Sequence, residues 1–124
     1  MKLDQENRSA RIVHYVKAAQ KALNDFPEEV RIDFLTELEL FRQGEPTRDI
    51  FRMQGSLHDV YEIKESDRTG TYRVMFTAII DGELWVLHAF QKKSTLGIAT
   101  PKHDLELIHQ RLKKVKNANA ARRR

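Results

Sequence analysis

The chain has 124 residues, 40% hydrophobic and 32% charged, and these proportions predict one soluble globular domain spanning residues 1–124. No apolar run approaches the roughly 20 residues that a membrane helix needs, and no signal peptide is evident at the start, so we expect a cytoplasmic protein without membrane contact. The absence of cysteine excludes disulfides and thiolate chemistry.

Charge is unevenly distributed along the chain. Residues 1–63 carry nine basic side chains against twelve acidic ones, whereas residues 64–124 carry thirteen against six. A basic half in a small protein predicts a polyanionic partner such as a nucleic acid, or an acidic protein.

The first part of the chain has a helical period. Apolar side chains predict one helix over about residues 8–24 and a second from Pro27 to about Arg42, where Gly44 and Pro46 end the pattern. Because the connection between them is short, we expect an antiparallel helical hairpin.

From Asp59 onward the period changes to two. The segments 59–64, 71–80 and 83–90 are typical of strands, and the pair Asp81-Gly82 predicts a tight hairpin between the last two. Thr100 and Pro101 open a last helix, after which residues 117–124 are expected to form a loose basic tail. The predicted fold is α+β, with the N-terminal helical hairpin packed on a three- to four-stranded antiparallel sheet and a C-terminal helix.

The hairpin turn fixes which side chains share a face of the sheet. One face collects Val74, Phe76, Ala78, Trp85, Leu87 and Ala89, and we expect the helices to cover it. The other face collects Arg73, Met75, His88, Phe90 and Lys92, which predicts a cationic surface away from the main core.

Simpler interpretations exist for the same residues. Arg73 can pair with Glu62 on the neighbouring strand, and His88 can be a half-buried, hydrogen-bonded residue. Lys92 and Lys93 can be a solvated strand end that blocks edge pairing. No histidine pair has the spacing of a helical zinc site, and we expect neither a metal nor a cofactor.

Two stretches resemble a known protein family. The segments "GSLHDVYEIK" and "TYRVMFTAIIDGELWVLHAFQKKSTLGIATPKHDLELIHQRLKKVK" are similar to the phage-related HigB-type toxins of the RelE/ParE superfamily. The likeness is strong over about residues 47–116 and looser over the first two predicted helices.

The resemblance implies a RelE-like, microbial-ribonuclease-like fold and the toxin of a type II toxin–antitoxin system. It implies a ribosome-dependent endoribonuclease, an mRNA interferase that cuts mRNA in the ribosomal A site and inhibits translation. The implied partners are a helix-turn-helix antitoxin, mRNA and ribosomal RNA. Two other functions stay open: a ParE-like inhibitor of DNA gyrase, and a non-catalytic module that binds antitoxin or RNA.

The resemblance and the predicted face together suggest a site. The family pattern points to Arg73, Lys92 and Lys93 as catalytic residues, and the hairpin geometry adds His88. Arginine suits a phosphate in the transition state, and histidine suits proton transfer near neutral pH. Lys64, Arg68 and Phe90 are expected to bind RNA. Since no tyrosine follows Tyr72, the role of the late tyrosine in several RelE-type enzymes would fall to His88 or Phe90, or be missing.

Overall fold

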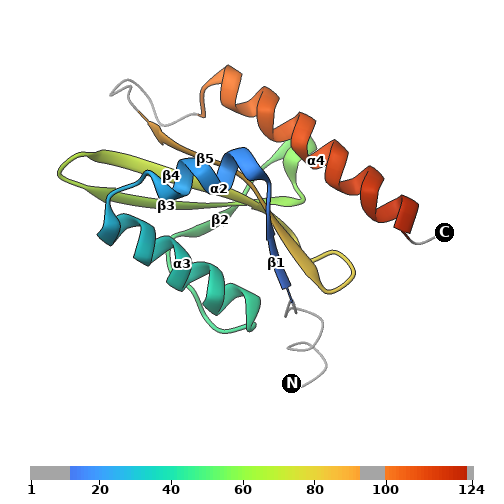
Figure 1. Cartoon of the computed structure of the whole chain (residues 1–124), viewed down its shortest axis with the longest axis horizontal. Coiled ribbons are helices and arrows are strands. Elements are labelled where there is room, and N and C mark those ends of the chain that lie inside the picture. Colours follow the sequence, from blue (N-terminus) through green and yellow to red (C-terminus); the bar gives the residue numbers. More distant parts are fainter. Residues whose placement is uncertain (1–11, 93–99, 123–124) are drawn as a thin grey trace.

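A computed structural model describes residues 12–92 and 100–122. Its elements in chain order are β1 (Ile12–Tyr15), α2 (Lys17–Asn24), α3 (Glu28–Arg42), β2 (Ile50–Arg52), the 3₁₀ turn η1 (Gly55–Leu57), β3 (Val60–Asp67), β4 (Gly70–Thr77), β5 (Glu83–Lys92) and α4 (Lys102–Arg122). The strands form one five-stranded mixed sheet in the order β1-β5-β4-β3-β2. The α+β class is therefore confirmed, with α4 on one side of the sheet and α3 on the other (Figure 1).

The N-terminal helical hairpin was predicted wrongly. Residues Ile12–Tyr15 form a strand that pairs in parallel with β5, so the first helix begins only at Lys17. This segment is rich in β-branched and aromatic residues, and the edge of β5 offers it backbone partners that a helix would not use. The sheet consequently has five strands, one of them parallel, instead of three or four antiparallel strands.

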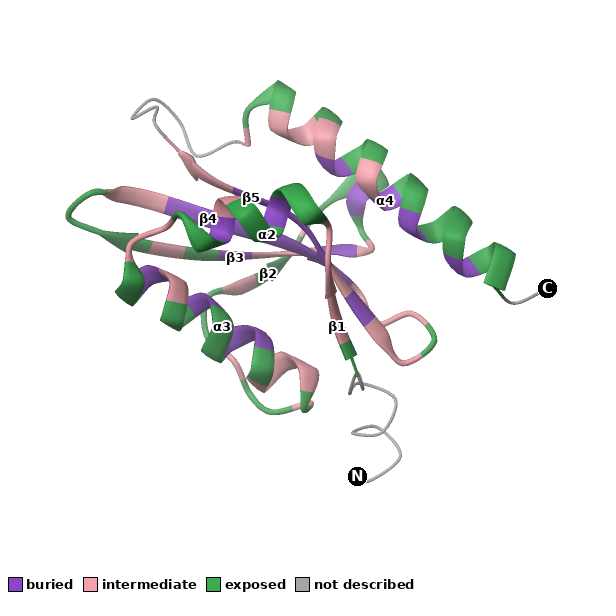
Figure 2. Cartoon of the chain, viewed as in Figure 1, coloured by how far each residue is buried: buried purple, intermediate pink, exposed green. Residues whose placement is uncertain are grey.

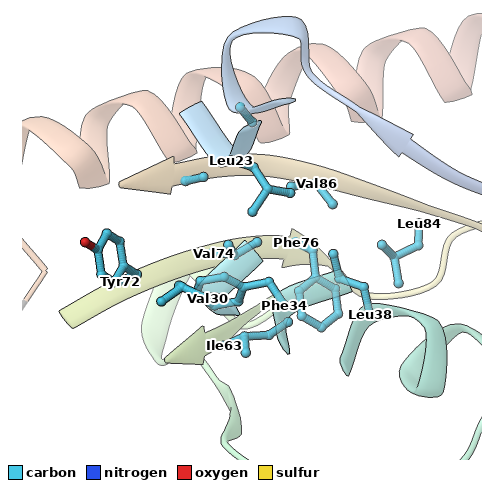
Figure 3. Close-up of a cluster of buried hydrophobic side chains, with 12 residues drawn as sticks. Leu23, Val30, Phe34, Leu38, Ile63, Tyr72, Val74, Phe76, Leu84 and Val86 are labelled. Carbon is cyan, nitrogen blue, oxygen red and sulfur yellow. The ribbon is translucent and has the colours of Figure 1, made fainter. Parts of the chain in front are cut away.

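The larger core lies between the sheet and helices α2 and α3 (Figure 3). Phe34 of α3 is fully buried, and it packs with Phe76 of β4 and Val86 of β5 in one apolar cluster. At about 25 cal/mol per Å² of apolar surface, each such side chain contributes roughly 1.5–3 kcal/mol to folding. This cluster explains why α2 and α3 lie against the sheet.

A second apolar cluster lies on the opposite face, beneath α4. The stripe predicted for the last helix supplies Ile108 and Leu112, which pack against Met75 and Leu87 of the sheet. Tyr72 to Thr77 are all buried in succession (Figure 2), as expected for a strand covered on both faces. Both faces of the sheet are thus covered, which corrects the expectation that only one would be.

The predicted hairpin register holds over most of its length. Ile80 pairs with Glu83, and Arg73, Val74 and Met75 pair with the predicted partners Phe90, Ala89 and His88. Between Met75 and Phe76 the register shifts, so Phe76 pairs with Val86 rather than with Leu87.

The shift in register moves side chains between the faces. A bulge lets two successive residues point the same way, and here Leu87 and His88 both reach the α4 side, in the second cluster and in contact with Asp104. Trp85 and Leu87 therefore pack beneath α4, whereas they were predicted on the other face.

The end of the chain also differs from the prediction. Helix α4 continues to Arg122, where a loose tail was expected from residue 117. Arg122 hydrogen-bonds Glu83 at 3.1 Å, and Glu83 accepts a second contact from His14 of β1 at 2.8 Å. The last turn of α4 is thereby tied to the β1 edge of the sheet. No described helix is long and apolar enough to cross a membrane.

Candidate nucleic-acid site

Cross-strand neighbours form three rows on the α4 side of β3, β4 and β5. The rows are Glu62–Met75–His88, Lys64–Arg73–Phe90 and Ser66–Thr71–Lys92. Directly paired residues of antiparallel strands point to the same side. The prediction that Arg73, His88 and Lys92 share one face is therefore confirmed.

Arg73 is the buried centre of this arrangement. Only 4% of the residue is exposed, and its Nη1 donates to Glu62 Oε2 at 2.9 Å. The simpler interpretation of Arg73 as a cross-strand partner of Glu62 is thus borne out. A buried ion pair of this kind holds the guanidinium in a fixed orientation.

Lysines on the neighbouring strands leave positive charge in excess around Arg73. Lys64 is exposed and Lys92 is partly exposed. Loss of solvent around Lys92 lowers the pKa of its ammonium group, and the positive charges of Arg73 and Lys64 lower it further, while Glu62 raises it. Three cations face one carboxylate here, so the group of residues Lys64, Arg73, Lys92 and Glu62, hereafter the cationic cluster, carries a net positive charge.

His88 is held at both ring nitrogens by α4. Its Nε2 lies 2.6 Å from Asp104 Oδ1, and its Nδ1 lies 2.8 Å from Arg111 Nη1. A guanidinium has no acceptor, so Nδ1 must carry the lone pair and Nε2 must donate its proton to Asp104. Arg111 Nη1 also donates to the carbonyl of Leu87 at 3.0 Å, next to the bulge.

Burial and the contact with Arg111 favour the neutral imidazole. Burial lowers the pKa of His88 most strongly, Arg111 and His103 lower it as well, and Asp104 opposes them. The residue is only 6% exposed. Because both ring nitrogens are hydrogen-bonded, His88 has no atom available for proton transfer to a substrate in this arrangement. His88 was predicted to lie on an open cationic surface, but it is buried in a contact with α4.

The other predicted site residues take different positions. Phe90 stacks on His88 with ring centroids 5.3 Å apart and is partly exposed. Arg68 lies exposed in the turn between β3 and β4. Lys93 falls outside the residues that the structure describes. Phe90 therefore links the His88 contact to the row that contains Arg73 and Lys64.

Three residues of this face were not selected from the sequence. Asp104 and Arg111 are seven positions apart, or two helical turns, and so share a face with the apolar stripe of α4; that spacing was the available signal. Phe51 pairs with Glu62 from the edge strand β2, and 57% of it is exposed. Its position on the edge strand gave no comparable signal.

No metal-binding arrangement is evident among the described residues. Within residues 12–92 and 100–122, no group of three or more histidine and acidic side chains is placed to hold a metal ion.

Comparison with known proteins places the chain in a family. The family described as phage derived protein Gp49-like (DUF891) matches residues 21–113, about three quarters of the sequence. The chain belongs to the Gp49-like family. This membership confirms the predicted relation to the RelE/ParE toxin superfamily. No curated protein sequence matches the chain.

Solved structures show that this Gp49-like protein has a RelE-like fold. The isolated RelE toxin of E. coli aligns with a TM-score of 0.51 and 20% identity, covering 70% of this chain and 89% of that one. A RelE mutant from E. coli in the free state aligns with a TM-score of 0.53 and 17% identity, covering 86% and 98%. The toxin–antitoxin complex RelBE2 of Mycobacterium tuberculosis also matches, with a TM-score of 0.47 and 19% identity over 69% and 95%.

Proposed function

We propose that this Gp49-like protein is the toxin of a type II toxin–antitoxin system and a metal-independent endoribonuclease that cuts mRNA and stops translation. The observation that carries the proposal is the cationic cluster. Three adjacent strands place Lys64, Arg73 and Lys92 on one face, with a single carboxylate among them. Such a cluster suits the phosphate of an RNA backbone, since phosphate oxygens accept hydrogen bonds from arginine and lysine.

The proposed reaction needs no group from outside the protein and the RNA. The 2′-oxygen of a ribose attacks the adjacent phosphorus, the bond from phosphorus to the 5′-oxygen breaks, and a 2′,3′-cyclic phosphate remains. One proton leaves the 2′-hydroxyl and another is delivered to the 5′-oxygen. Arg73 and Lys64 would stabilise the added negative charge at phosphorus.

Lys92 is the candidate base that accepts the proton of the 2′-hydroxyl, and its ammonium form would then protonate the leaving 5′-oxygen. A lowered pKa increases the fraction of its amine that is neutral near physiological pH, and only that fraction accepts a proton. In this proposal His88 supports Phe90 and α4 instead of acting on the substrate. Lys93 remains a predicted catalytic residue, since it follows Lys92 directly.

RNA would be held on both sides of the cationic cluster. Arg68 lies exposed in the turn between β3 and β4, and the rings of Phe51 and Phe90 offer apolar surfaces on which bases can stack. Contacts from Lys64 and Arg68 to phosphate would make binding weaken as salt concentration rises.

The partners of the site are part of the same proposal. Membership of the RelE/ParE superfamily supports a helix-turn-helix antitoxin as the inhibitor, and the A site of the ribosome as the place where mRNA is cut. The proposed attack of the 2′-oxygen on phosphorus requires no cofactor.

Induced expression in bacteria tests the proposal. Wild-type protein is expected to arrest growth, and primer extension on cellular mRNA is expected to show discrete cuts. Lys92→Ala and Lys64→Ala should each remove most of this cleavage while the protein stays folded, because both side chains reach solvent. Lys114→Ala, an exposed lysine on α4, is the matched control and should leave cleavage unchanged.

Other outcomes would identify the alternatives. Growth arrest with a DNA-damage response and intact mRNA would favour the ParE-like inhibitor of gyrase. No growth arrest and no cleavage would favour the non-catalytic binding module. Two observations support the non-catalytic binding module: the buried Arg73–Glu62 pair and the hydrogen bonds at both ring nitrogens of His88.

A further inference from the structure

Helix α3 has a second apolar stripe that its own core does not use. The first stripe, which includes Val30, Phe34 and Leu38, is buried against the sheet. Ile32 and Leu35, on the other side of the helix, are 48% and 40% exposed. Buried and exposed bands alternate along α3 (Figure 2).

The second stripe forms a shallow groove of about 340 Å³. Its lining consists of Ile32, Leu35, Thr36, Glu39 and Leu40, all from α3. Positions 28, 32, 35 and 39 recur at the spacing of one helix face. Glu28 and Glu39 therefore flank the apolar residues at the two ends of the stripe. We call this set, Glu28, Ile32, Leu35, Thr36, Glu39 and Leu40, the α3 groove.

The exposed surface of α3 is more acidic than basic. Four acidic side chains of this helix are exposed, against two partly exposed arginines, although the whole chain is positive by four. This acidic surface repels phosphate, which argues against nucleic acid as the occupant of the groove. The groove and the cationic cluster are thus suited to ligands of opposite charge.

The exposed side of α4 on a second copy fits the groove poorly. That side presents Lys113, Lys114 and Lys116, but the exposed positions of the helix carry polar, charged or alanine side chains and offer no large apolar group for the groove. Charge alone would match between α3 of one copy and α4 of another, but apolar surface would not.

We propose that the α3 groove docks a basic amphipathic helix of a partner protein, with aliphatic side chains at helical spacing and lysine or arginine beside them. The aliphatic side chains would cover Ile32 and Leu35, and the cations would pair with Glu28, since Glu39 already accepts hydrogen bonds from Arg42 and Gln43. A helix laid into a groove is a common mode of protein recognition and uses this spacing of anchors. The inference rests on the surface of α3 and is independent of the proposed RNA cleavage.

A peptide of defined chemistry tests the docking surface. The probe is a synthetic amphipathic peptide of about 15 residues, with leucine at i, i+3, i+4 and i+7 positions and lysine elsewhere. We expect it to bind the full chain, with chemical-shift changes centred on α3. Leu35→Asp should weaken binding by about tenfold or more, since it places a charge in the apolar contact and thereby removes on the order of 1.4 kcal/mol.

Matched variants separate docking from general attraction. Ile12→Asp adds the same charge at a similarly exposed apolar position on β1, and should leave binding unchanged. Glu28→Lys should weaken binding severalfold, and a peptide with glutamate in place of lysine should not bind. Ile32→Ser provides a milder second variant, and thermal unfolding of each variant confirms that it is folded.

Three results would overturn the proposal. The first is equal peptide binding by wild type and Leu35→Asp, and the second is an absence of peptide binding by the wild type. The third is self-association of the wild type that Leu35→Asp abolishes, because it would assign the groove to a second copy. Failure of the RNA cleavage experiment would not change the interpretation of any of these three results.

Discussion

Both faces of the sheet are covered by helices, but they differ in chemistry. Beneath α2 and α3 the contacts are apolar and aromatic, as between Phe41 and Phe76. Beneath α4 the apolar cluster shares the face with charged pairs, including Arg73–Glu62 and His88–Asp104. The face beneath α2 and α3 chiefly stabilises the fold, whereas the face beneath α4 combines apolar contacts with positioned charges.

The largest expected effect follows from the apolar face. Phe34→Ala removes a fully buried ring from the centre of this cluster, and should lower the free energy of unfolding by about 3–5 kcal/mol. Urea denaturation followed by circular dichroism measures the change. Leu35→Ala, the exposed neighbour on the same helix, is the control and should change stability little. Equal losses in the two variants would contradict the assignment of buried and exposed faces to α3.

A smaller effect is expected on the charged face. Arg111→Met leaves His88 Nδ1 and the Leu87 carbonyl without their donor, and a buried acceptor left unsatisfied destabilises by about 1–3 kcal/mol. The loss is measured by the same denaturation experiment. Lys113→Met on the same helix should shift stability by no more than about 0.5 kcal/mol. If Arg111→Met matches that control, the contacts of Arg111 with His88 and the Leu87 carbonyl contribute nothing to folding.

The same contact predicts a dependence on pH. Because the folded-state pKa of His88 lies below its unfolded value of about 6.5, the unfolded chain binds more protons as the pH falls through this range. The stabilisation from neutral His88 should be complete above about pH 6.5 and be lost as the pH falls toward the folded-state pKa.

The control for this pH dependence is His88→Gln. Glutamine keeps one donor and one acceptor but does not titrate, so its unfolding free energy should fall less between pH 8 and pH 5 than that of the wild type. The groups facing His88 include Asp104, Arg111 and His103 of α4, and they are unchanged in the variant. Parallel pH curves for the two proteins would show that His88 is not the titrating group.

Local sequence patterns predicted some elements of the fold but not those that depend on distant residues. The hairpin at Asp81-Gly82 and the stripe Leu105–Ile108–Leu112 are local patterns, and they predicted their elements correctly. The β1 strand depends on backbone partners from β5, more than 60 residues away, and no local period signals such pairing. Which face α4 covers depends in turn on the bulge near Met75, a property of the folded sheet.

Some features of the candidate site could likewise be predicted from the sequence, and others could not. Arg73 and Lys92 could be assigned to one face because the predicted register holds again from Met75 to Thr71, beyond the shift next to Phe76. The burial of His88 could not, since it requires Asp104 and Arg111 to approach from α4, which begins ten residues after the end of β5. Side chains that meet only through tertiary packing have no shared period in the sequence.

The smallest effect is expected where charge remains in solvent. Lys116 pairs with Asp59 at 2.7 Å, and this pair lowers the pKa of Asp59, yet the two side chains are 46% and 32% exposed. Exposed ion pairs contribute at most about 1 kcal/mol, and salt screens them further. Lys116→Ala should therefore destabilise the protein by less than Arg111→Met does, and a double-mutant cycle with Asp59→Ala measures the coupling. A coupling larger than the loss in Arg111→Met would mean that surface charge, rather than buried contact, holds α4 on the sheet.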